Sequence, residues 1–354
     1  MDSYIQQHVF NKSLCDILNS KYFSACQERL GIIKVVRTND ELEEAVETAA
    51  PGTILQLNGG DYQLTKPLHI DKAITIKGIA DKTSISYDQG EYVIKIISND
   101  KVILQDVGIG HEGGGFIAAC IICDSTVEIN RCKFYGKGFN YQDIKRNKSF
   151  DRNLLNMPCD GLHITGQSKG GVTNCVFYNK KSGVFIGGTA YVILECNTTR
   201  ESSAGVVFDD DAGGIARKNL CINSTTGIVV QGKAQSVLEG NTCTGGNFGI
   251  EYGDNASGLA RGNVCINTRN SGILVNGNAK PILESNSCRG NTNNGIRYQH
   301  GASGIARQNV CKNNGEYGVY VFPEALPILE DNIFEDNKLG SIFGYRGFEL
   351  TRGS

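Results

Sequence analysis

The chain has 354 residues and a formal net charge of −2, and only 20% of its residues are charged. This balance provides no bulk attraction for nucleic acid, and no apolar run approaches the ~20 residues that span a membrane. The 44 glycines far exceed the usual ~7%, and glycine disfavours helices. Composition therefore argues against nucleic acid and membrane as partners, and against a mainly helical protein.

Cysteine usage gives an expectation about the cellular compartment. The chain holds 13 cysteines, an odd number. The first 30 residues include charged side chains and lack the uninterrupted apolar core of a secretory signal. Together these features predict reduced thiols and a cytoplasmic location.

The N-terminal part of the chain reads as a helical cap over residues 1–50. An apolar face over residues 3–30 predicts a first helix. Asn39 is expected to N-cap a second helix over 40–48, which Pro51 and Gly52 end. Short strands are expected next, at 53–57, 68–70 and 73–76. Because stacked strands end in unpaired edges, a cap satisfies a structural need.

From residue 161 onward four residue types recur every 22 or 23 positions. The glycines are Gly161, Gly183, Gly205, Gly227, Gly249, Gly272, Gly295, Gly318 and Gly340. The asparagines are Asn174, Asn197, Asn219, Asn241, Asn263, Asn286, Asn309 and Asn332, each preceded by an alanine seven residues earlier from Asn197 on. The cysteines two residues later are Cys221, Cys243, Cys265, Cys288 and Cys311, and Cys132 follows Asn130 in the same way. Such a repeat predicts stacked coils of short strands ~4.8 Å apart, with Asn amides bonding from coil to coil and Cys facing inward.

The repeating unit resembles that of the right-handed parallel β-helix repeat family. It consists of Gly-Ile-x-Val, a turn, Ala, a short aliphatic run and Asn-x-Cys. The resemblance covers roughly residues 50–345. It implies an all-β fold: a right-handed, single-stranded parallel β-helix of ~22-residue coils over 51–345, followed by a C-terminal tail at 346–354. Members of this family include polysaccharide lyases, epimerases and sugar-binding proteins, and similar arrays occur in F-box ubiquitin-ligase receptors.

A second pattern doubles the repeat. Two residues before each Asn the charge alternates: Glu195, Arg217, Glu239, Arg261, Glu284, Arg307 and Glu330. Stacked coils would place each carboxylate beside a guanidinium, so we expect an ion-pair ladder that fixes the register.

The strand after each ladder glycine predicts a row of outward side chains. The row is His163, Phe185, Val207, Val229, Glu251, Leu274, Arg297 and Tyr320. Its apolar stretch, Phe185 to Val229, indicates either a binding stripe or a surface packed under a loop. A second copy of the chain on this stripe would make a homo-oligomer.

An insertion interrupts the array. The interval from Asn130 to Gly161 is about 22 residues longer than its counterparts, which places an inserted loop at about 133–158. The loop is basic and aromatic, and we expect Lys145, Arg146 and Tyr141 to bind an anionic sugar or polyanion. The alternative is a solvated loop folded on its own aromatic residues.

Candidate catalytic groups lie near this loop. His163 and Asp160 stand at its foot, and an imidazole transfers protons near neutral pH. Two coils on, Asp209, Asp210 and Asp211 share a turn, where Asp209 and Asp210 would act as an acid, or Asp209 and Asp211 as calcium ligands. The alternatives are a structural histidine and a solvated acidic turn. No other cofactor motif is found.

Two functional hypotheses follow. In the first, a lyase-, epimerase- or isomerase-like protein binds a carbohydrate or another small anionic ligand. Its catalytic residues are His163, Asp160, Asp209 and Asp210, and its binding residues are Lys145, Arg146, Tyr141, Phe185, Glu251 and Arg297. In the second, the chain is a non-enzymatic cytosolic scaffold that binds a partner along the apolar stripe.

Overall fold

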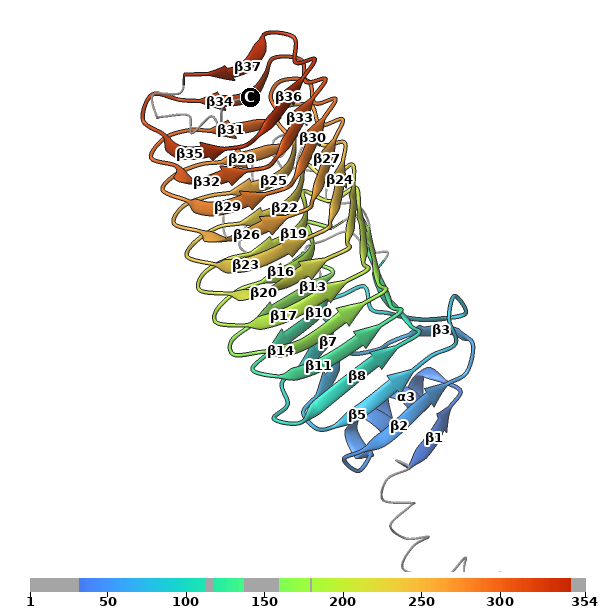
Figure 1. Ribbon diagram of the computed structural model, residues 1–354. Helices are drawn as coiled ribbons and strands as arrows, with labels where there is room; N and C mark the ends of the chain where they lie inside the picture. Colours follow the sequence, from blue (N-terminus) through green and yellow to red (C-terminus); the bar gives the residue numbers. More distant parts are fainter. Residues whose placement is uncertain (1–31, 112–117, 137–158, 179, 345–354) are drawn as a thin grey trace, which may run out of the picture.

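The computed structural model describes residues 32–111, 118–136, 159–178 and 180–344. These residues form a right-handed parallel β-solenoid of about 12 turns, which confirms the predicted fold. Figure 1 shows the coils stacked along one axis from β1 to β37. Each regular coil contributes one strand to each of three parallel sheets, here named A, B and C.

Sheet A contains β1 (Ile33–Val36), β2 (Thr53–Leu57), β5 (Ile74–Lys77), β8 (Lys101–Gln105), β11 (Thr126–Asn130), β14 (Lys169–Thr173), β17 (Tyr191–Glu195), β20 (Gly213–Arg217), β23 (Gln235–Glu239), β26 (Ser257–Arg261), β29 (Lys280–Glu284), β32 (Ser303–Arg307) and β35 (Leu326–Glu330). Sheet B contains β3 (Gly60–Gln63), β6 (Thr83–Ser86), β9 (Gly108–Gly110), β12 (Lys133–Tyr135), β15 (Val176–Tyr178), β18 (Thr198–Arg200), β21 (Leu220–Ile222), β24 (Thr242–Thr244), β27 (Val264–Ile266), β30 (Ser287–Arg289), β33 (Val310–Lys312) and β36 (Ile333–Glu335). Sheet C contains β4 (Leu68–Ile70), β7 (Tyr92–Ile96), β10 (Ala118–Cys123), β13 (Leu162–Thr165), β16 (Ser182–Ile186), β19 (Ala204–Phe208), β22 (Thr226–Val230), β25 (Phe248–Tyr252), β28 (Ile273–Val275), β31 (Ile296–Tyr298), β34 (Tyr317–Val321) and β37 (Gly340–Phe343).

The N-terminal end of the described chain is covered by helix α3 (Asn39–Thr48). Its N-cap is Thr38 rather than the expected Asn39, because the Thr38 hydroxyl accepts a hydrogen bond from the Glu41 N–H at 3.2 Å. Leu42, Ala45 and Val46 are buried and close the end of the core. Before the helix, β1 already pairs with β2 in sheet A, whereas the predicted helix at 3–30 lies outside the described residues.

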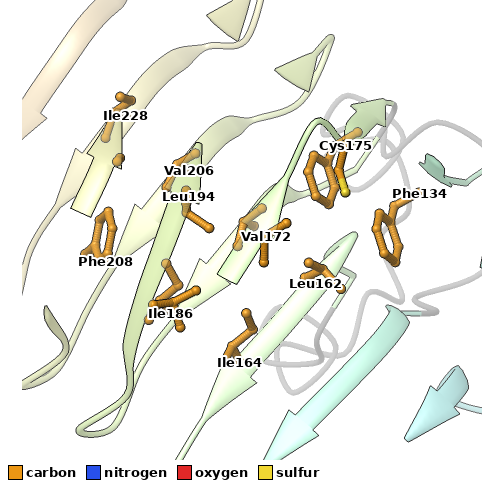
Figure 2. Packing of buried hydrophobic residues seen from close by; sticks show 14 of the residues in the cluster. Phe134, Leu162, Ile164, Val172, Cys175, Ile186, Leu194, Val206, Phe208 and Ile228 are labelled. Atoms are coloured by element: carbon orange, nitrogen blue, oxygen red, sulfur yellow. The ribbon is translucent and has the colours of Figure 1, made fainter. Parts of the chain in front are cut away.

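The core fills the inside of the solenoid with side chains that alternate inward along every strand. Figure 2 shows Phe134 from one coil and Leu162, Val172 and Cys175 from the next, all pointing into this space. The Phe134 and Phe177 rings stack with their centroids 4.9 Å apart. Further along, Cys221 to Cys311 form one buried row of directly paired residues, as predicted.

Cys132 does not belong to this cysteine row, contrary to the sequence prediction. The sheet B register places Phe134, Phe177 and Thr199 in line with Cys221. Cys132 instead lies two residues earlier, where its N–H donates to the Cys175 sulfur at 3.4 Å. In the early coils this inward position is therefore occupied by phenylalanine rather than cysteine.

The asparagine ladder is a continuous hydrogen-bonded chain from Asn197 to Asn332. In each rung the Asn Nδ2 and backbone N–H donate to the Oδ1 of the next Asn, at 2.9 to 3.0 Å. Asn174 is not a member, because Cys175 occupies that place and donates its N–H to Asn197 Oδ1. The ladder thus begins one coil later than predicted.

The alternating charges stack in register along the edge of sheet A, as predicted. They pair two by two: Arg217 with Glu195 at 2.8 Å, Arg261 with Glu239 at 2.5 Å and Arg307 with Glu284 at 2.9 Å. Each arginine therefore contacts the glutamate of the preceding coil.

We predict that Asn263→Ala destabilises the solenoid strongly. Asn263 is fully buried, donates to Leu238 O and accepts from the Asn241 N–H, so alanine removes both hydrogen bonds and leaves the buried Asn241 N–H without this partner. The expected loss in the free energy of unfolding is about 3 kcal/mol or more. Urea denaturation measures it, with exposed Asn255→Ala as the control, expected within ~0.5 kcal/mol of wild type. Equal midpoints for the two variants would contradict the structural role of the ladder.

Candidate functional site

The outward face of sheet B is hollowed over its first five strands, β3 to β15. The groove has a volume of about 1040 Å³. It is lined by Gly60, Asp61, Gln63, Asp81, Lys82, Thr83, Ser84, Ser86, Asp88, Asp106, Val107, Gly108, His111, Arg131, Lys133, Tyr135, Gly136 and Tyr178. The groove therefore runs along the solenoid axis across five coils.

Two glycines in β9 create the floor. Gly108 and Gly110 pair with outward positions of β6 and β12, so this strand has no outward side chain. A Cβ at Gly110 would lie 2.5 Å from the Tyr135 ring, which shows that the ring rests on this glycine. A Cβ at Gly108 would stay 3.5 Å or more from other atoms. The floor is thus open above Gly108 and covered by an aromatic ring above Gly110.

One wall of the groove carries ion pairs. Arg131 binds the Asp106 carboxylate through Nε and Nη2 at 2.6 and 2.7 Å, and Lys133 contacts Asp81 at 2.5 Å. The Arg131 hydrogen bonds hold the pKa of Asp106 below its usual value, against the opposing effect of burial. Both carboxylates therefore present hydrogen-bonding oxygens beside cationic donors.

The other wall leads to the corner between sheets B and C. A Cβ at Gly136 would lie 2.6 Å from Lys180 Nζ and 2.7 Å from His111 Nε2, so the amine and imidazole are neighbours behind this glycine. Both side chains are buried. Burial lowers the pKa of Lys180 to about 8, although the nearby Cys159 and Asp160 act in the opposite direction.

Asp160 and His163, predicted as a catalytic pair, lie in contact on the sheet C side of this corner. The His163 Nδ1 lies 2.8 Å from the Asp160 carboxylate, whose other oxygen accepts the Ser182 N–H at 3.0 Å. Asp160 is only 2% exposed. The His163 ring also stacks on Phe185 with centroids 4.7 Å apart. A carboxylate at Nδ1 favours the tautomer that leaves Nε2 as a proton acceptor.

The acidic turn does not join this pair. Asp209 to Asp211 follow β19, at the carboxyl ends of the sheet C strands, whereas Asp160 precedes β13 at the opposite end. Asp209 accepts from Gln231 Nε2 at 2.6 Å, and Asp210 accepts the Gly188 N–H at 2.8 Å. These carboxylates hold neighbouring turns together.

Glu251 and Arg297 occupy the predicted outward row of sheet C, yet the row separates them. His163, Glu251 and Arg297 stand in register four and then two coils apart, which corresponds to roughly 19 and 10 Å. Burial raises the pKa of Glu251, and the Arg297 guanidinium lies 4.9 Å from the Phe322 ring centroid. The structure therefore provides three separate positions rather than one site.

The apolar stretch of that row is largely covered. Val207 is 7% exposed, and Phe185 and Val229 are partly buried. Phe185 contributes to the Asp160 and His163 pair rather than to an open stripe.

The insertion begins later than expected. Lys133 belongs to strand β12, in register with β9 and β15, so the excess residues start after Gly136. Lys145, Arg146 and Tyr141 lie outside the described residues. The two described ends of the insertion, Gly136 and Cys159, both lie at the corner beside Lys180.

Metal ligands are not assembled in the described part of the chain. Among the residues that the structure describes, no three His, Cys, Asp or Glu side chains converge on one point. The described ranges also contain no helix long and apolar enough to cross a membrane.

Sequence reasoning missed the sheet B groove. Its residues lie mostly between Gly60 and Gly136, before the regular repeat begins, so no ladder marks them. The usable signal was local: Gly108 and Gly110 alternate with a buried isoleucine, which gives a strand with an empty outer face.

The fold and its groove define a right-handed parallel β-helix protein. The sequence agrees: the family described as "Right handed beta helix region" matches residues 244–354. A second family, described as "Periplasmic copper-binding protein (NosD)", matches residues 121–254. No curated protein matches the sequence. Copper favours imidazole or sulfur ligands brought together, and no such cluster of three ligands exists among the described residues, so copper does not fit this part of the chain.

Several solved structures share the fold. The Azotobacter vinelandii mannuronan C-5 epimerase AlgE4 A-module has a TM-score of 0.69 at 13% identity, covering 90% of this chain and 96% of that one. The periplasmic alginate epimerase AlgG has a TM-score of 0.55 at 14% identity, covering 90% and 84%. The GH87 alpha-1,3-glucanase of Streptomyces thermodiastaticus has a TM-score of 0.51 at 12% identity, covering 85% and 66%. These similar structures are carbohydrate-modifying proteins.

The predicted cytoplasmic location is wrong. One matching family is described as periplasmic, and the epimerase AlgG is a periplasmic protein, which points to a location outside the cytoplasm. The physical reason for the error is burial: of the 11 free cysteines that the structure describes, nine are buried. Thiols packed as core side chains do not report the redox state of their compartment.

We predict a pH-dependent stability that depends on Lys180. Its pKa of about 8 in the fold lies below the ordinary 10.5, so the unfolded chain holds more protons between these values and stability rises with pH across this window. Lys180→Met should remove a cost of roughly 3 kcal/mol that is fully present below pH 8. Urea denaturation at pH 7 and pH 10 should show the advantage of the variant shrinking as pH rises.

The control for this experiment is Lys218→Met, an exposed lysine, which should differ from wild type by the same amount at both pH values. Parallel pH curves for wild type and Lys180→Met would show that the buried amine carries no such penalty.

Proposed function

We propose that this protein binds a carbohydrate chain in the sheet B groove and modifies it by proton transfer at the B–C corner. The observation that carries the proposal is the groove itself, in which aromatic rings, ion-paired carboxylates and a buried imidazole face one open channel. The carbohydrate-modifying proteins of similar fold support it.

The groove surface suits a sugar. The Tyr135 and Tyr178 rings stack 5.9 Å apart and offer aromatic surface to the apolar face of a sugar ring. Asp106, Arg131 and Lys133 provide acceptors and donors for hydroxyl groups along the wall. A channel spanning five coils, roughly 19 Å, would take several sugar units.

The charged residues that line the groove limit the charge density of the ligand it can bind. Its lining includes four aspartates against two lysines and one arginine, and two of these cations are already paired. A densely charged polyanion would meet repulsion here, whereas hydroxyl-rich sugars with isolated carboxylates would find both signs of partner. We therefore propose a carbohydrate of low charge density.

Proton-transfer groups flank the end of the groove. His111 lines the channel, and the Asp160 and His163 pair lies beyond Lys180 at the same corner. In an epimerase-type reaction, a neutral imidazole would take the proton from the carbon beside a sugar carboxylate, and a second acid would return a proton to the other face of that carbon. In a lyase-type reaction, the acid would protonate the glycosidic oxygen as its bond to the ring carbon breaks and a carbon–carbon double bond forms. We propose His111 and the Asp160–His163 pair for these roles.

The binding test fills the floor of the groove. We predict that Gly108→Val weakens carbohydrate binding at least tenfold, because its side chain would occupy the channel while its Cβ stays 3.5 Å from other atoms. Gly171→Val is the matched control on sheet A, where the nearest atom lies 4.0 Å from the added Cβ. A glycan array followed by titration calorimetry of the best ligand provides the measurement. Equal affinity for both variants would place the ligand elsewhere.

The reaction test uses the same ligand. A lyase would produce a conjugated double bond that absorbs in the ultraviolet, and an epimerase would incorporate deuterium from heavy water. His111→Gln and His163→Gln should reduce turnover while Gly171→Val retains it. Binding without turnover would leave a carbohydrate-binding module and refute the proton-transfer part of the proposal.

A further inference from the structure

Sheet A carries an uninterrupted row of outward aliphatic side chains, here named the aliphatic stripe. Successive coils place these residues directly beside one another in register. The stripe is Ile193, Ile215, Val237, Leu259, Ile282, Ile305 and Ile328.

These side chains face outward. Their neighbours on either side, such as Val192 and Leu194, are buried in the core, except for the half-buried Gly258 and Gly304, whereas the stripe residues are half-buried or exposed. Ile282 is 36% exposed, and Ile328, at the end of the row, is 50% exposed. Stacked side chains shield one another laterally, so the surface that remains is the flat top of the row. Figure 1 shows these strands, β17 to β35, as a regular ladder along one side of the solenoid.

The other sheets lack such a row. On sheet B the outward position alternates between aliphatic and hydroxyl residues, as in Leu220, Thr242 and Val264. On sheet C the row contains Glu251 and Arg297. The aliphatic stripe is therefore a property of one face, and outward positions do not need to be aliphatic to form this solenoid.

A charged rail runs beside the stripe. The alternating Glu and Arg residues lie two positions further along each strand, so they share the outward face with the stripe. Their side chains are 21 to 50% exposed in the three pairs described above. Sheet A thus presents an apolar band flanked by charges whose sign changes at every coil.

We propose that the aliphatic stripe and its rail pair two copies of this chain face to face, in antiparallel orientation. The two copies are related by a two-fold axis that lies between them and runs parallel to the strands. This rotation reverses the direction of the solenoid axis, and each strand position of one copy faces the same strand position of the other. Stripe then faces stripe, and rail faces rail. Such an isologous contact uses one surface of each copy.

The alternating charges select the register. With the axis between β26 and β29, Arg261 faces Glu284 of the second copy, Glu239 faces Arg307, and Arg217 faces Glu330. With the axis on a coil, every charge would face its like. Charges of opposite sign face each other only when the two-fold axis lies between two coils. The rail therefore disfavours every dimer in which the axis lies on a coil. An unrelated partner would have to reproduce this alternation, whereas a second copy supplies it by symmetry.

The size of the contact sets its strength. With this axis the contact extends from β20 to β35, roughly 24 Å, and the five residues of each strand span roughly 16 Å, on the order of 400 Å² of flat surface on each copy. Stable specific interfaces bury about 800 Å² per partner. We therefore expect a reversible dimer with a dissociation constant on the order of micromolar.

The test places a charge near the axis. In Leu259→Lys, two ammonium groups lie one coil apart across the proposed interface inside an apolar band, so the dissociation constant of the dimer should rise at least tenfold. Val264→Lys, at a half-buried outward position of sheet B in the same coil, is the matched control and should dimerise as wild type. Sedimentation equilibrium from 1 to 100 μM measures association, and urea midpoints check that both variants fold.

Each outcome decides the proposal. A concentration-dependent dimer that Leu259→Lys weakens and Val264→Lys retains supports it, and weakening by 0.5 M salt supports the rail. A wild-type monomer throughout the range overturns it. Equal dimerisation of wild type and Leu259→Lys, or equal loss in both variants, overturns the assignment to sheet A. The carbohydrate test on sheet B does not depend on this result.

Discussion

The hydrogen-bonded stacking of one coil on the next is the constraint on which the rest of this structure depends. Buried Asn side chains from Asn197 to Asn309 bind the backbone of the preceding coil and the amide of the next Asn, so neither the turn nor the register can change without unpaired polar groups. Fixed register converts every repeated position into a row. Inside, the rows fill the core with cysteine and alanine; outside, they become surfaces such as the aliphatic stripe.

The sequence predicts the fold where the repeat is regular and less well where it is not. The cysteine row from Cys221 and the charged rail were predictable because residue identity and spacing repeat together. Cys132 and Asn174 were assigned to the wrong rows because spacing alone cannot detect a shift of one or two positions in the turn. That shift follows from core volume: Phe134 and Phe177 fill a place that cysteine fills later, and the chain adjusts around them.

The candidate site was predicted in part, for a related reason. Asp160 and His163 lie three residues apart at the start of one strand, so their contact follows from local geometry. Glu251 and Arg297 were assigned to the same surface because they share a row, but a row extends ~4.8 Å at each coil and does not gather its members. The groove forms because Gly108 and Gly110 have no side chains to fill it. Its other lining residues come from five coils and do not recur at a common spacing, so no sequence pattern identifies them.

The two faces illustrate what a solenoid can build. A strictly repeated coil produces surfaces that repeat every coil, which suits a long contact with a symmetric partner, but it cannot place one imidazole or one amine at a single point. Chemistry of that kind requires coils that depart from the repeat. In this chain such departures occur at the N-terminal end, where Gly108, Gly110 and the insertion after Gly136 interrupt the pattern, and where His111, Lys180 and the Asp160–His163 pair lie. Regular coils and irregular coils are therefore suited to different tasks, and the proposed dimer contact and the proposed carbohydrate groove lie on different sheets and mostly on different coils.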